Sequence, residues 1–198
     1  MGKTIPKKIG LFGGTFDPVH NGHLSIAESF LNSGCIDELW VLLTPYPPHK
    51  PGNGNTPYQI RLSMLEAAFF GIPGITISTI ENDLPKPSFT VNTIRYLKSR
   101  YLEHHFFFCM GEDSLSQFHT WKYYKEILEE AHLLVADRPG ADHKNVEQDI
   151  LNKTTFVEHT PLAVSSSSVR EALKSGKDVF SDVPENVLLI IEKEHLYK

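Results

Sequence analysis

Short apolar segments alternate with segments of helical spacing along the whole chain. The apolar segments are typical of buried strands and occupy residues 9–12, 38–43, 75–79, 106–110, 133–136 and 155–158. Apolar residues recur at helical spacing over residues 21–32, 57–70, 90–102, 121–130, 144–152 and 186–195. Strands that alternate with helices indicate βαβ units, so this pattern predicts an α/β fold with a mostly parallel sheet. Ligands of such folds bind at the carboxyl ends of the strands.

The composition is that of an ordinary globular protein. We expect one domain spanning residues 1–198, because this length suffices for one sizeable hydrophobic core. No apolar run approaches the roughly eighteen residues of a membrane span, and no apolar leader follows the N-terminal lysines, so we expect a cytoplasmic protein. The net charge of -5 argues against a protein that coats nucleic acid. Cys35 and Cys109 are far apart in sequence, and we expect two free thiols.

The first predicted strand runs into a glycine turn and then into the start of a helix. Gly13 and Gly14 end the strand and let backbone N–H groups approach a ligand with no Cβ in the way. A turn at Asp17-Pro18 follows, and the helical pattern begins near Asn21. A strand, a glycine turn and a helix N-terminus together form an anion site. The motif is neither a P-loop nor a dinucleotide fingerprint, because it matches neither G-x-x-x-x-G-K-[ST] nor G-x-G-x-x-G.

Two histidines, His20 and His23, stand at this helix start with Gly22 between them. Residues at this spacing face the same side of a helical turn, and Gly22 keeps the space between the rings open. The positive end of the helix disfavours imidazolium in the free protein, whereas a bound phosphate would favour it. We therefore predict a phosphate-binding pair. The alternative is a surface histidine pair beside a tight turn.

Further polar residues follow other predicted strands or open other helices. Lys50 lies in the loop of residues 44–55, where it would either neutralise phosphate or face solvent. Asp113 follows the fourth strand and would either accept hydrogen bonds from a ribose or cap a short helix. Arg170 follows the serine run of residues 165–168, which opens a helix. Hydroxyls, free amides and a guanidinium suit a triphosphate, and the alternative is one N-cap serine with the others as filler.

Six motifs occur along the chain in a fixed order. They are G-G-T-F-D-P-x-H-x-G-H-L at residues 13–24, P-P-H-K at 47–50, P-S-F-T-x-x-T at 87–93, G-x-D-x(7)-W at 111–121, R-P-G at 138–140 and V-S-S-S-x-V-R at 164–170. Together they resemble the motifs of bacterial nicotinate mononucleotide adenylyltransferases, which belong to the (T/H)-x-G-H nucleotidylyltransferase superfamily. Ser167 stands where that family has threonine, so a hydroxyl is kept. The resemblance implies a Rossmann-like, doubly wound sheet with helices on both faces.

The resemblance implies transfer of the adenylyl group of ATP to nicotinate mononucleotide, giving deamido-NAD and pyrophosphate. It implies ATP contacts by Gly13, Gly14, Thr15, Phe16, His20, His23, Gly111, Asp113, Arg138, Ser166, Ser167 and Arg170. It places the backbone amides of Thr90, Val91 and Lys122 on the pyridine carboxylate, with Trp121 stacked on the pyridine ring. The catalytic set is His20, His23, Lys50 and Arg170. Mg²⁺ would be carried by the ATP phosphates, because such an ion needs no all-protein cage.

Two other functions stay open on the sequence. A sister adenylyltransferase that uses nicotinamide mononucleotide or phosphopantetheine would share the first and last motifs, but not Thr90-Val91 with Trp121-Lys122. A nucleotide-binding regulator without catalysis is disfavoured by the intact pair His20 and His23 and by the basic residues of the motifs. The expected partners are ATP and nicotinate mononucleotide, with no nucleic acid and no membrane. The oligomeric state is left open, a homo-oligomer included.

Overall fold

The computed structural model describes residues 5–45, 56–87, 89–138 and 140–198. These residues form a six-stranded sheet in the order β3-β2-β1-β4-β5-β6. The strands are β1 (Lys8–Gly14), β2 (Glu38–Leu43), β3 (Ile75–Ser78), β4 (His105–Gly111), β5 (His132–Asp137) and β6 (Thr154–Glu158). Every pairing in the sheet is parallel, and each predicted strand is confirmed. The chain winds outward from β1 in one direction and from β4 in the other, so the predicted doubly wound fold is confirmed.

The helices lie between the strands, as the alternating pattern predicts. They are α1 (Asn21–Asn32), α2 (Tyr58–Phe69), α3 (Thr90–Arg100), α4 (Glu112–Ser116), α5 (Tyr124–Glu130), α6 (Gln148–Leu151), α7 (Ser166–Lys174) and α8 (Glu185–Lys193). Two 3₁₀ turns, η1 (Ile80–Asn82) and η2 (Phe118–Thr120), add to them. The predicted start of α1 at Asn21 agrees with the structure.

Two predicted helix starts are wrong. We expected a helix from Trp121, but Tyr123 has a left-handed backbone with φ of 65°, which a right-handed helix excludes, so α5 begins at Tyr124. We expected a helix from Pro57, but Pro57 has an extended ψ of 142° and is itself the N-cap of α2. The helix predicted over residues 144–152 shortens to the single turn of α6.

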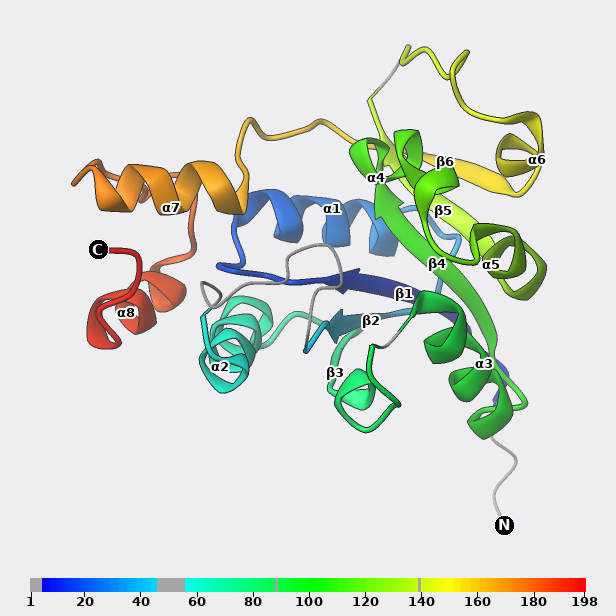
Figure 1. The fold of residues 1–198 in the computed structure, drawn as a ribbon, viewed down its shortest axis with the longest axis horizontal. Coiled ribbons are helices and arrows are strands. Elements are labelled where there is room, and N and C mark those ends of the chain that lie inside the picture. The colour runs from blue at the N-terminus through cyan, green and yellow to red at the C-terminus, as the bar shows by residue number, and fades with distance from the viewer. Residues whose placement is uncertain (1–4, 46–55, 88, 139) are drawn as a thin grey trace.

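Helices cover both faces of the sheet and close one hydrophobic cluster on each. The first cluster joins the sheet to α1, α2, α7 and α8 through Phe30, Met64, Val169 and Val187. The second joins it to α3 and α5 through Ile94, Leu97 and Ile127. Leu11 and Phe12 are neighbours in β1 and belong to opposite clusters, as expected for successive residues of a strand. Figure 1 shows α1 and α3 on opposite sides of the sheet.

The strand order reverses between β1 and β4, which pair directly from Lys8↔His105 to Phe12↔Cys109. The connection after β1 leads toward β2, and the connection after β4 leads toward β5. These connections therefore diverge and leave a crevice at the carboxyl ends of the two strands. Gly13 and Gly14 end β1, and Gly111 ends β4, at this crevice.

Both cysteines are free thiols, as predicted. Cys109 is buried in β4, and its burial raises the pKa of the thiol far above the usual range, so it stays protonated. Among the described residues, we find no helix with the length and apolar character needed to cross a membrane.

Candidate active site

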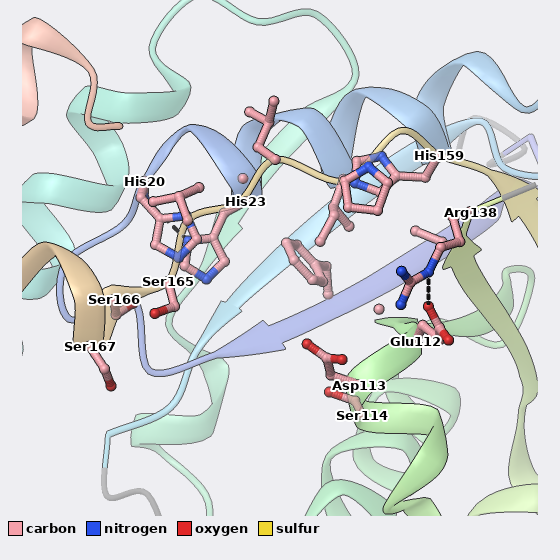
Figure 2. Close-up of a pocket in the computed structure, with 18 of the residues that line it drawn as sticks. His20, His23, Glu112, Asp113, Ser114, Arg138, His159, Ser165, Ser166 and Ser167 are labelled. Atoms are coloured by element: carbon pink, nitrogen blue, oxygen red, sulfur yellow. Dashed lines mark hydrogen bonds and ion pairs between the residues drawn. The ribbon is translucent and has the colours of Figure 1, made fainter. Parts of the chain in front are cut away.

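A cavity of about 520 Å³ lies at the crevice between β1 and β4. Most of the residues predicted to contact ATP line it: Gly13, His20, His23, Gly111, Asp113, Arg138, Ser166 and Ser167. Figure 2 shows the two histidines with the serines at the start of α7 on one side, and the start of α4 with Arg138 on the other. Segments from four separate parts of the sequence therefore meet around one space.

His20 and His23 face each other at this cavity, as their spacing predicts. Their ring centroids are 3.7 Å apart with an interplanar angle of 31°. The backbone N–H of His20 donates to Nδ1 of His23 over 3.2 Å. Because a nitrogen that accepts a hydrogen bond carries no proton, neutral His23 holds its proton on Nε2. Nδ1 of His20 is buried without a hydrogen-bond partner among the described residues, which suits a group completed by ligand or water.

Both imidazoles are neutral in the free protein at neutral pH. Burial lowers the pKa of His20 to about 4, with the carboxylate of Asp182 acting in the opposite direction. Burial, and then the neighbouring His20, lower the pKa of His23 well below its usual range. The predicted direction agrees with the structure, but the main cause is burial and not the helix dipole. A phosphate beside these rings would raise both pKa values again.

The glycines of the first motif serve different purposes. A Cβ on Gly13 would meet nothing within 4 Å, so this residue leaves the cavity open as predicted. A Cβ on Gly14 would lie 2.7 Å from the ring of Phe16. Gly14 therefore leaves room for the ring of Phe16, and its contact with ATP stays a prediction. A Cβ on Gly22 would lie 3.0 Å from both His20 and Val164, so Gly22 lets the serine segment approach the histidines.

The start of α7 presents free backbone amides to the cavity. Ser165 is the N-cap, and its Oγ accepts from the N–H of Ser168 over 3.1 Å, while the N–H of Ser165 donates to Oγ of Ser168 over 3.0 Å. The amides of Ser166 and Ser167 have no acceptor within the described ranges, and both residues line the cavity. Unpaired amides at the positive end of a helix bind anions. Ser165 is thus the cap of the alternative interpretation, Ser166 and Ser167 form a wall of the cavity, and their binding of a triphosphate stays a prediction.

The start of α1 is less free than predicted. The N–H of Asn21 donates to the carbonyl of Asp182 over 2.8 Å, and Nδ2 of Asn21 donates to the carbonyl of Ser181 over 2.8 Å. The segment before α8 therefore occupies the first amide of α1. The amide of Gly22, which lines the cavity, has no acceptor among the described residues, so the anion site expected at α1 stays a prediction.

The start of α4 forms the opposite wall. Glu112, Asp113 and Ser114 line the cavity there. Gly111 is the N-cap of α4, so Asp113 lies inside the helix and is not its cap. The carboxylate of Asp113 is exposed and has no partner in the described part of the chain, which leaves it available to a ligand. Arg138 pairs with Glu112 over 3.1 Å between Nε and Oε2 (Figure 2).

Some predicted ATP residues stand behind the cavity. Phe16 is 2% exposed and packs edge-on against His23 with centroids 4.9 Å apart, so its side chain supports the histidine. The carbonyl of Thr15 accepts from Arg61 over 2.7 Å. Arg170 donates from Nη1 to the carbonyl of Asp17 over 2.7 Å and from Nη2 to Oγ of Ser167 over 3.3 Å. Arg170 is therefore adjacent to the cavity through Ser167. Lys50 lies outside the described residues.

The residues predicted to bind nicotinate mononucleotide lie at a second place, near the start of α3. The amides of Asn92 and Thr93 both donate to the carbonyl of Phe89, over 2.8 Å and 3.3 Å. The amides of Thr90 and Val91 have no acceptor within the described part of the chain. The start of α3 therefore offers two donors and no acceptor, which is what a carboxylate requires.

The segment before α5 lies against the start of α3. Nζ of Lys122 lies 4.5 Å from the ring centroid of Phe89, which precedes α3. The amide of Lys122 also lacks an acceptor among the described residues. The indole of Trp121 packs against Phe108 and Phe118, with centroids 5.9 Å and 5.5 Å apart. None of the residues predicted to bind nicotinate mononucleotide lines the cavity that holds the histidines. The predicted ATP residues and the predicted mononucleotide residues therefore occupy separate positions.

Sequence reasoning missed several residues of the cavity. His159 directly follows β6 and is 5% exposed, with Nδ1 3.0 Å from Oγ of Ser29. The rule that sites lie at carboxyl ends of strands would have selected it. Ile26 lies one helical turn beyond His23 and also faces the cavity, which the helical spacing already indicates.

The comparisons agree with these features. The cytidylyltransferase-like family matches residues 11–172. A protein of Flavobacterium johnsoniae named "Probable nicotinate-nucleotide adenylyltransferase" is 36% identical over 96% of this chain and 99% of its own length. One of the same name from Geobacillus kaustophilus is 38% identical over 96% of this chain and 86% of its own.

The fold is also found among solved structures. The Plasmodium falciparum nicotinic acid mononucleotide adenylyltransferase complexed with NaAD has a TM-score of 0.80 at 20% identity, covering 96% of this chain and 97% of that one. With this fold, a match over most of the sequence and relatives of near-equal length, the chain belongs to the cytidylyltransferase-like family and, within it, to the nicotinate-nucleotide adenylyltransferases.

Proposed function

We propose that this protein transfers the adenylyl group of ATP to nicotinate mononucleotide, giving deamido-NAD and pyrophosphate. One observation carries the proposal: two neutral, closely spaced imidazoles face the same cavity as the amides of Ser166 and Ser167, which have no acceptor among the described residues. This arrangement offers hydrogen-bond donors to a chain of phosphates. The names of the relatives, all nicotinate-nucleotide adenylyltransferases, support the choice of substrates.

The chemistry needs alignment and charge stabilisation. The nucleophile is a phosphate oxygen of the mononucleotide, which is already an anion at neutral pH, so no general base is required. It attacks the α-phosphorus of ATP, the bond to the β-phosphate oxygen breaks, and pyrophosphate leaves. His20 and His23 would hold the α-phosphate, and Ser166, Ser167 and Arg170 would hold the leaving pyrophosphate. Stabilising charge that grows in the transition state is the main source of catalysis in such a site.

Divalent metal would enter with the nucleotide. Within the described ranges, there is no cluster of three or more His, Cys, Asp or Glu side chains that could hold a metal ion. Mg²⁺ commonly binds substrate phosphates and keeps several waters, so it does not require such a group. We therefore propose that Mg²⁺ rides on the ATP phosphates, where it neutralises charge. Lys50 is the further proposed source of positive charge.

The nucleotides would bind in two adjoining places. Gly13, Asp113 and Arg138 line the cavity and are proposed to contact ATP, with Asp113 accepting from the ribose. The unpaired amides of Thr90, Val91 and Lys122 are proposed to hold the pyridine carboxylate, and Trp121 to stack on the ring. We extend the proposal to a single-domain, cytoplasmic enzyme whose partners are these small molecules.

Pyrophosphate release with ATP and Mg²⁺ tests this function. The acceptors to compare are nicotinate mononucleotide, nicotinamide mononucleotide and phosphopantetheine, each at several concentrations. We expect rapid release with nicotinate mononucleotide alone. Preference for another acceptor would indicate a sister transferase, and no release with any of the three would contradict the proposal.

A further inference from the structure

We propose that Tyr197, near the C-terminus, is a positioning residue of the active site, whose hydroxyl fixes the turn that carries His20. The proposal rests on the adenylyl transfer proposed above. The hydroxyl of Tyr197 bonds to Asp17 and Thr56, which do not line the cavity. It acts through Asp17, which lies in the turn between β1 and α1, three residues before His20.

A closed ring of hydrogen bonds joins Tyr197 to this turn. The hydroxyl of Tyr197 donates to Oδ1 of Asp17 over 2.5 Å. Oγ1 of Thr56 donates to the hydroxyl oxygen of Tyr197 over 3.0 Å, and the N–H of Thr56 donates to Oδ2 of Asp17 over 3.2 Å. Asp17 and Thr56 are 4% and 8% exposed. Both carboxylate oxygens of Asp17 are therefore engaged in a site that water scarcely reaches, and one bond comes from the far end of the chain.

The same turn is held by the wall of the cavity. The guanidinium of Arg170 donates to the carbonyl of Asp17 over 2.7 Å, and Oγ of Ser166 donates to the carbonyl of Pro18 over 2.9 Å. A shift of Asp17 would therefore move both the turn before His20 and its link to the start of α7. These are the two groups that we propose to contact the phosphates.

Arg61 holds the start of the turn from the other side. It is 2% exposed and donates four hydrogen bonds to main-chain carbonyls. The acceptors are Thr15 at 2.7 Å, Thr44 and Thr56 at 3.0 Å, and Pro45 at 3.1 Å. A buried arginine whose N–H groups donate to main-chain carbonyls fixes the backbone geometry and does not bind phosphate. With Arg61 holding Thr15, the side chain of Asp17 is held by the hydroxyl of Tyr197 and the N–H of Thr56.

The protonation state of Tyr197 agrees with this role. Burial and the bond to Asp17 both raise the pKa of Tyr197 far above its usual range. The hydroxyl therefore stays protonated at neutral pH and remains a donor. Replacement by phenylalanine removes this donor and leaves the ring, which packs on the first hydrophobic cluster.

The test is Tyr197→Phe, with Tyr124→Phe as matched control. Tyr124 also donates from its hydroxyl to a carboxylate, Oε2 of Glu147 over 3.0 Å, but on the exposed surface of α5. We expect kcat to fall about tenfold or more in Tyr197→Phe, because misplacing a reacting group by 1 Å costs up to about a hundredfold. The KM of the acceptor should stay within about twofold, since the hydroxyl of Tyr197 bonds to Asp17 and Thr56, which belong to neither α3 nor the segment before α5. Tyr124→Phe should match the parent protein.

A second measurement separates this proposal from the proposed function. The imidazole signals of His20 in an NMR titration need no turnover, and we expect them to move in Tyr197→Phe but not in Tyr124→Phe. If Tyr197→Phe does not fold, Thr56→Val takes its place. This variant loses only the hydrogen bond from Oγ1 of Thr56 to the hydroxyl of Tyr197, so it should give a smaller change in the same direction. Parental kcat and parental His20 signals in Tyr197→Phe, at any melting temperature, would overturn the positioning role. Failure of the parent protein to release pyrophosphate would instead overturn the function.

Discussion

Lowering the pH should reduce the free energy of unfolding of the free protein, because His20 is buried in its neutral form. Its pKa is lowered from 6.5 to about 4 by burial. As the pH falls through 6.5 the unfolded chain takes up a proton at this imidazole, whereas the folded protein does so only near pH 4. The unfolded state therefore binds more protons between these values, so the free energy of unfolding must fall as the pH falls across this window.

The size of this loss follows from the two pKa values. Between pH 7 and pH 5, a group that shifts from 6.5 to about 4 removes about 2 kcal/mol of stability. The result depends little on the folded value, because at pH 5 the folded imidazole is still mostly neutral. His23 shifts in the same direction and adds to the loss.

Urea unfolding of the parent protein and of His20→Asn at pH 7 and pH 5 measures this contribution. Asparagine suits the N-cap position that His20 occupies in α1 and does not titrate. His132 and His159, whose pKa values burial also lowers, are present in both proteins, so their effects cancel. We expect the parent protein to lose about 2 kcal/mol more than the variant. An equal loss in both would refute the buried, neutral state of His20.

Three predictions concern catalysis. His23→Ala should lower kcat by roughly a hundredfold or more with the fold intact, as expected for lost charge stabilisation; near-parental turnover in the purified variant would contradict it. Arg170→Ala should raise the KM of ATP more than that of the acceptor, because this guanidinium stands beside Ser167; a change in the acceptor constant alone would show that the serine segment serves the other substrate. Nicotinate mononucleotide should be preferred over nicotinamide mononucleotide by at least about a hundredfold in kcat/KM, because a pocket of hydrogen-bond donors leaves an amide NH₂ unpaired. Trp121→Ala should weaken binding of the mononucleotide far more than binding of ATP. Equal use of the two mononucleotides in one pyrophosphate-release assay would contradict the assignment of the carboxylate site to Thr90 and Val91.

The four central strands β1, β2, β4 and β5 were predictable because each contains an apolar run that only a doubly covered sheet can bury. Helix ends were less predictable, because they depend on single backbone angles that contacts elsewhere decide. The left-handed angle at Tyr123 moved the start of α5 by three residues from the predicted Trp121. Nothing in the local sequence indicates that angle.

The site divides in the same way. The pairing of His20 with His23 and the serine wall at Ser166 are local consequences of helix geometry, so spacing predicted them. The sequence motif could not separate residues that face the cavity from residues that support it, and Phe16 belongs to the second group. The bond between Asp17 and Tyr197 joins positions 180 residues apart. Only the folded chain brings them together, so no local pattern reveals it.

The closeness of the histidine pair adds to burial in keeping the pair neutral. Two unit charges about 4 Å apart repel by roughly 4 kcal/mol at a protein surface, and the rings of His20 and His23 are 3.7 Å apart. His23 as imidazolium would also have to release the N–H of His20, which it accepts at Nδ1. The free site therefore offers the Nε2–H of neutral His23, and Nδ1 of His20 has no partner among the described residues. Positive charge at this pair becomes favourable only when phosphate supplies the opposing charge, so the charge of the site is coupled to the presence of its substrate.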